Sequence, residues 1–178
     1  MITACAERKR NFLCKGLLRF CSVIVIATCT LAAPPFSYAD DVKDLVTAAR
    51  RGNTATVGEL LARGIDVNAK INNGWTALIY ASRDGYIDVV KLLLDKGADV
   101  NMKNAIGWTA LMAASANGHI EVVKLLLTKN PEVNTKDNNG RTALIYAQEY
   151  EFPEIIQLLK EAGAKEYLYQ DVPNVIAE

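Results

Sequence analysis

Few side chains in this sequence have the types and spacing that catalysis or metal binding requires. His119 is the only histidine, so the chain has neither a histidine pair for a metal ion nor a base for a nucleophilic triad. We interpret it as a packed residue at the start of a helix. Tyr86 lies 33 residues before it and Phe152 lies 33 residues after it, so all three are expected at equivalent positions. No glycine-rich phosphate-binding loop follows a strand pattern, and the glycines fit turns.

Three carboxylates also recur every 33 residues, namely Asp88, Glu121 and Glu154. Paired carboxylates can act as a general acid and a general base. However, Lys91 and Lys124 follow the first two on the next helical turn, a placement that favours exposed ion pairs on a helix. The sequence therefore predicts a protein that is not an enzyme and that needs no catalytic residue, metal ion or cofactor.

Residues 1–39 have the organisation of a signal peptide. A basic start is followed by an apolar run at positions 20–33 and then by Ser37-Tyr38-Ala39, which places small residues where signal peptidase reads them. The apolar run is shorter than the about 20 residues that a membrane-spanning helix needs, so cleavage is favoured over anchoring. We expect the mature chain to begin at Asp40 and to insert in no membrane.

Two other forms of export remain open. Residues 9–15 are similar to a twin-arginine signal with one arginine replaced, although an ordinary basic start explains them as well. Residues 26–29 are similar to a lipoprotein box with an unfavourable residue before Cys29.

Cleavage would remove every cysteine and change the net charge. The four cysteines are Cys5, Cys14, Cys21 and Cys29, so the mature chain would contain no disulfide and no thiol ligand, as suits an oxidising compartment. Without residues 1–39 the sequence has 15 basic and 19 acidic residues, a net charge of −4. Nucleic acid and anionic membranes are therefore not expected as partners.

The strongest signal in the chain is an internal repeat of constant length. The positions that recur include Asn68, Asn101 and Asn134; Gly74, Gly107 and Gly140; Thr76, Thr109 and Thr142; and Leu78, Leu111 and Leu144. A more degenerate copy precedes them, with Leu45, Ala48, Gly52 and Gly64 in register. A repeat of about 33 residues predicts a stacked array with an extended recognition surface.

Residues 42–165 resemble the ankyrin repeat family. The family's Thr-Pro-Leu-His-x-Ala signature is present as Thr76-Ala77-Leu78-Ile79-Tyr80-Ala81, with Ala at the proline position and Ile or Met at the histidine position. We expect apolar contacts to replace those of the missing histidine. The resemblance implies an all-α repeat solenoid of about four units, each a helix-turn-helix plus a β-hairpin turn.

The residue pattern within one unit predicts two short helices that are stable only when stacked. Thr76 is placed to cap the first helix, and Val89, Val90, Leu93 and Leu94 give the second an apolar stripe. Gly85 and Gly97 follow the helices, where a left-handed residue ends them. The segment 99–107 is predicted to form a pair of extended strands closed by a turn.

We divide the chain on this basis into a signal peptide and four repeats with a tail. The boundaries are 1–39 for the signal peptide, 40–71 for a capping repeat, 72–103 and 104–136 for two full repeats, 137–165 for the C-terminal repeat and 166–178 for the tail. The tail contains apolar residues that can cover the last helix, and it can equally be a disordered peptide.

The resemblance implies that a protein partner contacts the turn tips and the outer face of each first helix. Carried over to this sequence, the candidate binding residues are Asn72, Asn73, Trp75, Arg83, Ile106, Trp108, Asn117, Asn138, Asn139, Arg141 and Tyr150. Trp75 and Trp108 are the only tryptophans and lie one repeat apart, about 10 Å in a helix stack. They either anchor a partner or cover the stack.

We therefore expect an exported, monomeric protein-binding module that is periplasmic or secreted. The identity of the protein partner stays open. The chain is similar to exported bacterial ankyrin proteins that accompany periplasmic catalase or that block a toxin, which implies an accessory, protective or inhibitory role. The alternative is a secreted effector that binds host proteins, although many delivered effectors use other export signals.

Overall fold

The computed structural model describes residues 38–166. The expected signal peptide, apart from Tyr38 and Ala39, therefore lies outside the described residues, as do the four cysteines, the two other export signals and residues 167–178 of the tail. The described residues form a stack of helix pairs.

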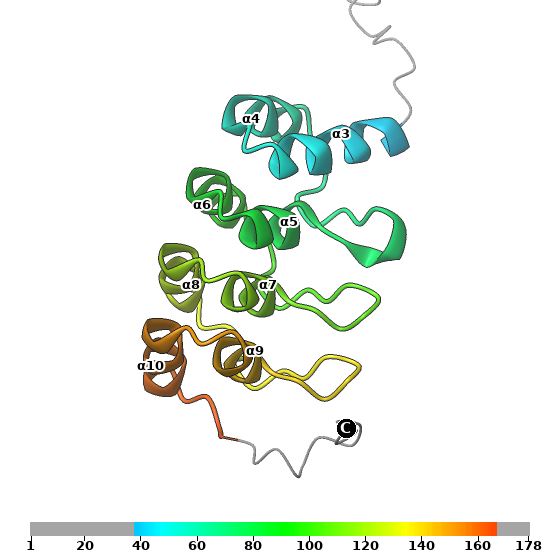
Figure 1. Ribbon diagram of the computed structural model, residues 1–178. Coiled ribbons are helices and arrows are strands. Elements are labelled where there is room, and N and C mark those ends of the chain that lie inside the picture. Colours follow the sequence, from blue (N-terminus) through cyan, green and yellow to red (C-terminus); the bar gives the residue numbers. More distant parts are fainter. Residues whose placement is uncertain (1–37, 167–178) are drawn as a thin grey trace, which may run out of the picture. The chain divides into compact units, whose positions relative to one another are not determined.

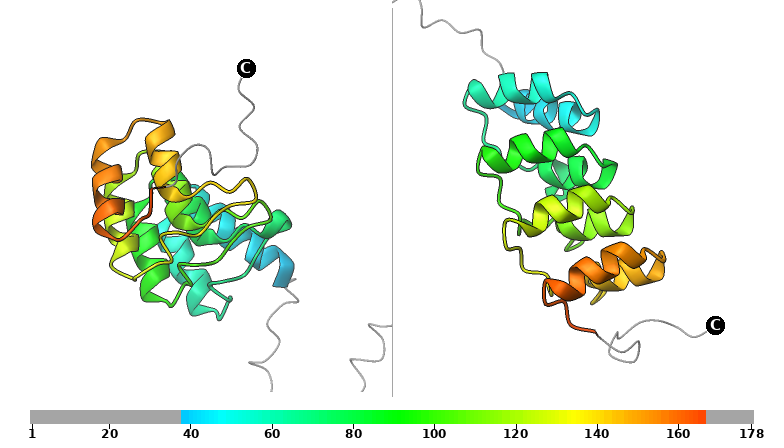
Figure 2. Two further views of the ribbon diagram at one scale, coloured as in Figure 1. Left: turned by 90° about the horizontal axis from the view of Figure 1, so that it is seen from below. Right: turned by 90° about the vertical axis from the view of Figure 1, so that its left-hand side faces the viewer.

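Each layer of the stack consists of two antiparallel helices. The first helices are α3 (Tyr38–Arg50), α5 (Ala77–Asp84), α7 (Ala110–Ala116) and α9 (Ala143–Glu149). The second helices are α4 (Thr54–Ala62), α6 (Ile87–Asp95), α8 (Ile120–Leu127) and α10 (Pro153–Glu161). Figure 1 shows the pairs stacked one on another, and the right-hand view of Figure 2 shows the second helices side by side. The all-α repeat solenoid is confirmed.

The hydrophobic core follows the register of the repeat. Leu78, Leu111 and Leu144 on the first helices are buried. On the second helices the equivalent side chains Leu93, Leu126 and Leu159 have no exposed surface. Each helix buries its apolar side against the partner helix of its own repeat and against the helices of the neighbouring repeats, so the stability of a repeat depends on the next one.

The predicted helix caps are confirmed. The hydroxyl oxygen of Thr76 accepts a hydrogen bond from the backbone N–H of Ile79 at 3.3 Å, and Thr109 and Thr142 cap α7 and α9 in the same way. Gly85 ends α5 in the left-handed conformation, with φ of 78°. Each such cap satisfies an amide that the first turn of a helix leaves without a partner.

Gly85 and Gly118 are also required for space. A Cβ atom on Gly85 would lie 2.6 Å from the ring of His119, and one on Gly118 would lie 2.6 Å from the ring of Phe152. His119 thus packs between repeats as predicted, and its Nε2 lies 2.9 Å from the carbonyl oxygen of Arg83. At the next equivalent position Glu151 adopts φ of 57° although it is not glycine.

The expected pairs of β-strands are absent from residues 38–166. The turns project from the first-helix side of the stack, and η1 (Asn72–Gly74) forms the tip of the first of them (Figure 1). The Asn104 N–H donates to the backbone carbonyl of Trp108 at 3.0 Å, and the Gly107 N–H donates to the backbone carbonyl of Asn104 at 3.0 Å. The reciprocal bond of a β-ladder does not form, because the Trp108 N–H donates to the side-chain oxygen of Asn104 at 2.9 Å and not to its backbone carbonyl.

Asparagine side chains join each repeat to the next. The Asn68 side-chain oxygen accepts a hydrogen bond from the Asp99 N–H at 2.8 Å, and Asn101 accepts from the Glu132 N–H at 2.9 Å. Asn134 accepts from the Lys165 N–H at 2.7 Å. The recurrence of asparagine once per repeat therefore has a structural cause, because its amide reaches the backbone of the following repeat.

Candidate partner-binding surface

Four aromatic rings form one continuous row where the turns meet the first helices. Trp75 is stacked on Tyr80, with ring centroids 4.4 Å apart, and lies 6.5 Å from Trp108. Trp108 meets the edge of Tyr146 at 5.2 Å. We call these four residues the aromatic row. It runs across three repeats, so it presents one surface assembled from distant parts of the sequence.

The two tryptophan rings are closer together than helix stacking alone predicts, and position 113 explains why. Repeats two and four carry Tyr80 and Tyr146 on their first helices, but the third repeat has Ala113 at the equivalent position. Trp108 thus has no ring of its own repeat to stack on, and it contacts the rings of Trp75 and Tyr146 in the neighbouring repeats.

Three arginines lie over the rings of this row. The guanidinium carbon of Arg83 is 4.8 Å from the centroid of Tyr80 and 5.5 Å from that of Trp75. Arg50 lies 5.4 Å from Tyr80, and Arg141 lies 5.0 Å from Tyr146. Contacts of this kind between a cation and an aromatic face are attractive and hold the arginines in place.

Two of the arginines are also ion-paired. Arg83 donates to both carboxylate oxygens of Asp84, at 2.8 and 3.1 Å, and this hydrogen bonding raises the pKa of the guanidinium further. Arg141 donates to Glu149 at 2.9 Å. The charged groups along the row are therefore held in fixed positions, which lowers the entropic cost of binding a partner there.

Tyr146 lies at the centre of a buried hydrogen-bond network. Its hydroxyl donates to Asp137 Oδ2 at 2.6 Å and accepts from the indole N–H of Trp108 at 2.9 Å. Burial, together with the hydrogen bond to Asp137, raises the pKa of Tyr146 to about 12. The other oxygen of Asp137 accepts from the backbone N–H groups of Asn139 and Arg141, so one carboxylate connects the turn to the row.

The sequence search matched a family model for ankyrin repeats (3 copies) at residues 4–104 and 102–170. These two segments cover most of the chain. The chain belongs to the ankyrin repeat family. No curated protein matches the sequence.

The departures from the ankyrin signature are accommodated by packing. Ile79 and Met112, which stand at the histidine position of the signature, are almost completely buried. Apolar contact has therefore replaced the polar contacts of that histidine, as predicted. Ankyrin repeats form a non-catalytic scaffold for protein–protein interaction, and the aromatic row lies on the turn side of this scaffold.

Several asparagines proposed as binding residues serve the ankyrin stack itself. The side chain of Asn138 donates to the carbonyl oxygen of Ala105 in the preceding turn at 2.9 Å. Asn117 donates to the Ala113 carbonyl at 2.8 Å and ends α7. Asn73 has φ of 66°, and its carbonyl accepts from the Ala105 N–H. Asn72 and Asn139 are exposed.

The other candidate binding residues divide into two groups. Trp75, Arg83, Trp108 and Arg141 are half-buried and lie together in the row and its arginines. Ile106 at a turn tip and Tyr150 after α9 are exposed, at 50% and 52% of their surface. Sequence reasoning missed Arg50, Tyr80, Asp137 and Tyr146. The signal that could have revealed the tyrosines was their recurrence two repeats apart.

The expected ion pairs on the second helices are found in part. Lys124 lies 3.0 Å from Glu121 and 3.1 Å from Glu154 in the next repeat. Between Asp88 and Lys91, both in the described chain, no such pair forms, so that prediction was wrong. Lys91 has the equivalent acidic residues in register, Asp88 on α6 and Glu121 on α8, but Glu121 pairs with Lys124 instead.

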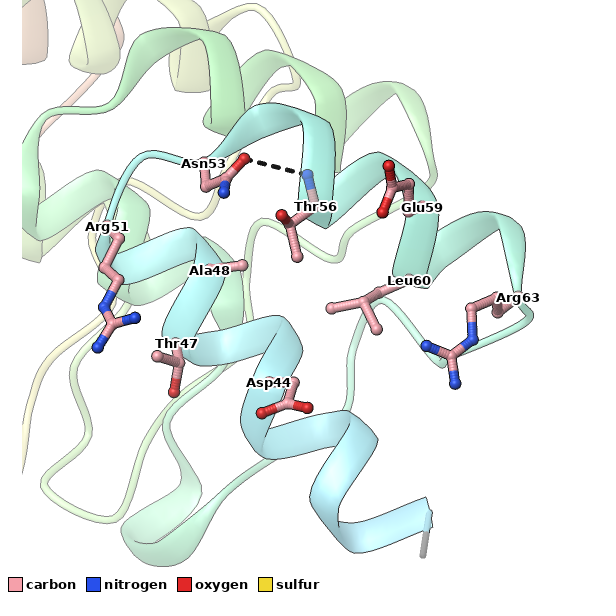
Figure 3. Close-up of a pocket in the computed structure, with 9 residues that line it drawn as sticks. All are labelled: Asp44, Thr47, Ala48, Arg51, Asn53, Thr56, Glu59, Leu60 and Arg63. Atoms are coloured by element: carbon pink, nitrogen blue, oxygen red, sulfur yellow. Dashed lines mark hydrogen bonds between the residues drawn. The ribbon is translucent and has the colours of Figure 1, made fainter. Parts of the chain in front are cut away.

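A groove of about 370 Å³ lies between α3 and α4 on the first repeat (Figure 3). Ala48 and Leu60 contribute apolar atoms, and Asp44, Glu59, Arg51 and Arg63 are among the polar residues around them. The opposite charges balance, and Arg63 also pairs with Asp41 at 3.1 Å. These features fit the polar face that a terminal ankyrin repeat needs in water.

Residues 38–166 contain no group of three or more histidine, cysteine or acidic side chains that could hold a metal ion. In the same part of the chain no helix is long and apolar enough to span a bilayer.

Proposed function

We propose that the protein is exported and acts as a non-catalytic binding module in the periplasm of a Gram-negative bacterium. In that compartment it would protect, assist or inhibit a partner protein. The observation that carries the proposal is the aromatic row with its fixed arginines. Tryptophan, tyrosine and arginine are the residue types most enriched among binding hot spots.

Export is supported by the order of features in residues 1–39. It is supported further by the absence of cysteine from position 30 onward, because a chain without thiols tolerates an oxidising compartment. Binding at the turn tips is supported by Ile106, a large apolar residue left exposed there, and Tyr150 at the end of the first helix α9 is exposed as well.

Cell fractionation and N-terminal sequencing test the export step. We expect a periplasmic protein that begins at Asp40. A chain that keeps Met1, or one acylated at Cys29, would contradict cleavage after Ala39. Recovery in the culture medium would favour the alternative of a secreted effector.

Site-specific photo-crosslinking in living cells tests the binding surface. A photo-reactive residue is placed at Ile106 or at Tyr150, with Lys91 on the opposite, second-helix side as the control. We expect the same discrete crosslinked product from positions 106 and 150 and none from position 91. Products only from position 91, or none from any position, would refute the proposed surface.

Point variants then measure what the surface contributes. Ile106→Asp should weaken binding of the crosslinked partner by about 2 kcal/mol, as expected for a contact near the centre of an interface, without changing the melting temperature. Trp108→Ala is less informative, because its side chain also packs within the row. A variant at Ile106 that binds normally would show that the turn tips are not part of the interface.

A further inference from the structure

The turns carry a row of basic residues in addition to the aromatic row. Lys70, Lys103 and Lys136 recur at the spacing of the repeat, one in each turn, and all three are exposed. The Lys70 ammonium group donates to the carbonyl oxygen of Lys103 at 3.3 Å, so the chain positions of neighbouring lysines lie side by side along the stack. We call these three residues the lysine row.

The tips of the turns supply almost no negative charge to this row, and the exposed acidic residues Asp66, Asp99 and Glu132 lie four residues before the lysines, at the start of each turn. Within residues 70–76, 103–109 and 136–142 the only acidic residue is Asp137, and its side chain is buried and hydrogen-bonded to Tyr146. Among the described residues, no carboxylate lies within ion-pair distance of Lys70 or Lys103. Lys124 on α8, in contrast, has two carboxylate partners.

The sign of this charge is opposite to that of the rest of the chain. Residues 40–178 carry a net charge of −4. The second helices α6 and α10 each contain two acidic residues and one lysine. A basic row on an acidic chain attracts a complementary, negatively charged partner to this side and repels it from the other.

We infer that the lysine row binds an extended, acidic segment of a partner protein, an inference that rests on the proposed protein-binding function. Packed helices are separated by about 8–10 Å, and an extended chain in the polyproline II conformation rises about 3.1 Å per residue with three residues per turn, so every third side chain faces the same way. A segment running along the stack therefore meets one lysine with about every third residue. The matching pattern is Asp or Glu at every third position, with an apolar side chain against Ile106.

Exposed ion pairs contribute little individually, and salt screens them. The mark of such an interaction is therefore its dependence on ionic strength and on charge sign, while the stability of the fold stays unchanged.

The experiment uses the protein purified in the form in which it accumulates in cells. Three fluorescein-labelled peptides of equal length are titrated and followed by fluorescence anisotropy. The first has Glu at every third position, the second has the same number of Glu residues in one block, and the third has Lys in place of Glu. An RNA oligonucleotide and anionic lipid vesicles serve as probes of other anionic surfaces.

We expect the regularly spaced Glu peptide to bind most tightly and to lose about tenfold in affinity between roughly 20 and 200 mM NaCl. Lys103→Glu should weaken it about tenfold at low salt, whereas Lys91→Glu on α6 should change it by less than about twofold. Both variants should melt at the wild-type temperature.

Several results would overturn the inference. They are equal losses for Lys103→Glu and Lys91→Glu, preference for the Lys peptide or the block peptide, or tighter binding of RNA or vesicles than of any peptide. If these occur while Ile106 still crosslinks a partner in cells, the acidic-segment inference is wrong and the proposed function stands. If position 106 crosslinks nothing but the Glu peptide binds as expected, the lysine row binds acidic segments and the contact proposed for Ile106 in cells is wrong.

Discussion

The hydroxyl of Tyr146 is the group whose removal tests the network most directly. Tyr146→Phe keeps the ring against Trp108 and removes only the oxygen that donates to Asp137 and accepts from the Trp108 indole. The Asp137 carboxylate and the Trp108 indole N–H then each lose a hydrogen-bond partner. Because Tyr146 is only 3% exposed, water cannot readily replace the hydroxyl.

The expected loss follows from the two hydrogen bonds. A neutral hydrogen bond contributes about 1 kcal/mol net, and one to a charged group about 1.5–3 kcal/mol. We therefore expect Tyr146→Phe to lower the free energy of unfolding by about 2.5–4 kcal/mol. Tyr80→Phe is the matched control, because Tyr80 occupies the equivalent position two repeats earlier and makes no hydroxyl hydrogen bond within the described chain. Its cost should stay below about 0.5 kcal/mol.

Urea denaturation measures both variants, followed by circular dichroism at the helix band and by tryptophan fluorescence. Both tryptophans belong to the aromatic row, so fluorescence reports on the row and circular dichroism on the helices. Equal and small effects of the two substitutions would show that the network of Trp108, Tyr146 and Asp137 does not exist in solution. A large effect of Tyr80→Phe alone would show that the hydroxyl of Tyr80 in the second repeat stabilises the fold and that the hydroxyl of Tyr146 in the fourth does not, which contradicts the network.

The remaining predictions concern pH, the core and the left-handed positions. The tyrosine hydroxyl has a pKa near 10 in the unfolded chain and of about 12 at Tyr146 in the folded protein, so the free energy of unfolding should fall as the pH rises from 10 to 12. In thermal melts at alkaline pH, Tyr146→Phe should abolish this part of the loss. Leu126→Ala should cost about 2–5 kcal/mol and Lys129→Ala less than about 0.5 kcal/mol in urea titrations. By calorimetry, Gly118→Ala should lower the melting temperature, because its Cβ would clash, whereas Glu151→Gly should raise it by relieving an unfavourable φ.

The fold could be predicted from the sequence because its determinants repeat. Thr76, Gly85 and Leu78 each act locally, as a cap, a helix end and a core residue, and each recurs at the same offset in neighbouring repeats. A single occurrence of such a signal is weak, but several occurrences in phase fix the boundaries of the helices. The packing of His119 was predictable for the same reason, since Tyr86 and Phe152 occupy its register.

The candidate surface could be predicted only in part. Its tryptophans and arginines stood out by residue type, but their arrangement depends on Ala113, whose small side chain leaves Trp108 to contact the neighbouring repeats. That effect reaches across repeats and has no counterpart in the local pattern. The prediction of β-strands was wrong for another reason. The N–H groups of Trp108 and Arg141 donate to the side chains of Asn104 and Asp137, so the second rung of a ladder does not form.

If the aromatic row binds a partner, the same side chains serve both the stability of the stack and recognition. Trp108 contacts two rings and donates a hydrogen bond, so its substitution weakens the stack whether or not a partner touches it. A loss of binding caused by Trp108→Ala is therefore no evidence of direct contact. Ile106 and the lysine row differ, because their side chains are exposed and none of them belongs to the aromatic row. Variants at those positions separate recognition from folding, and they decide whether the turns bind a partner.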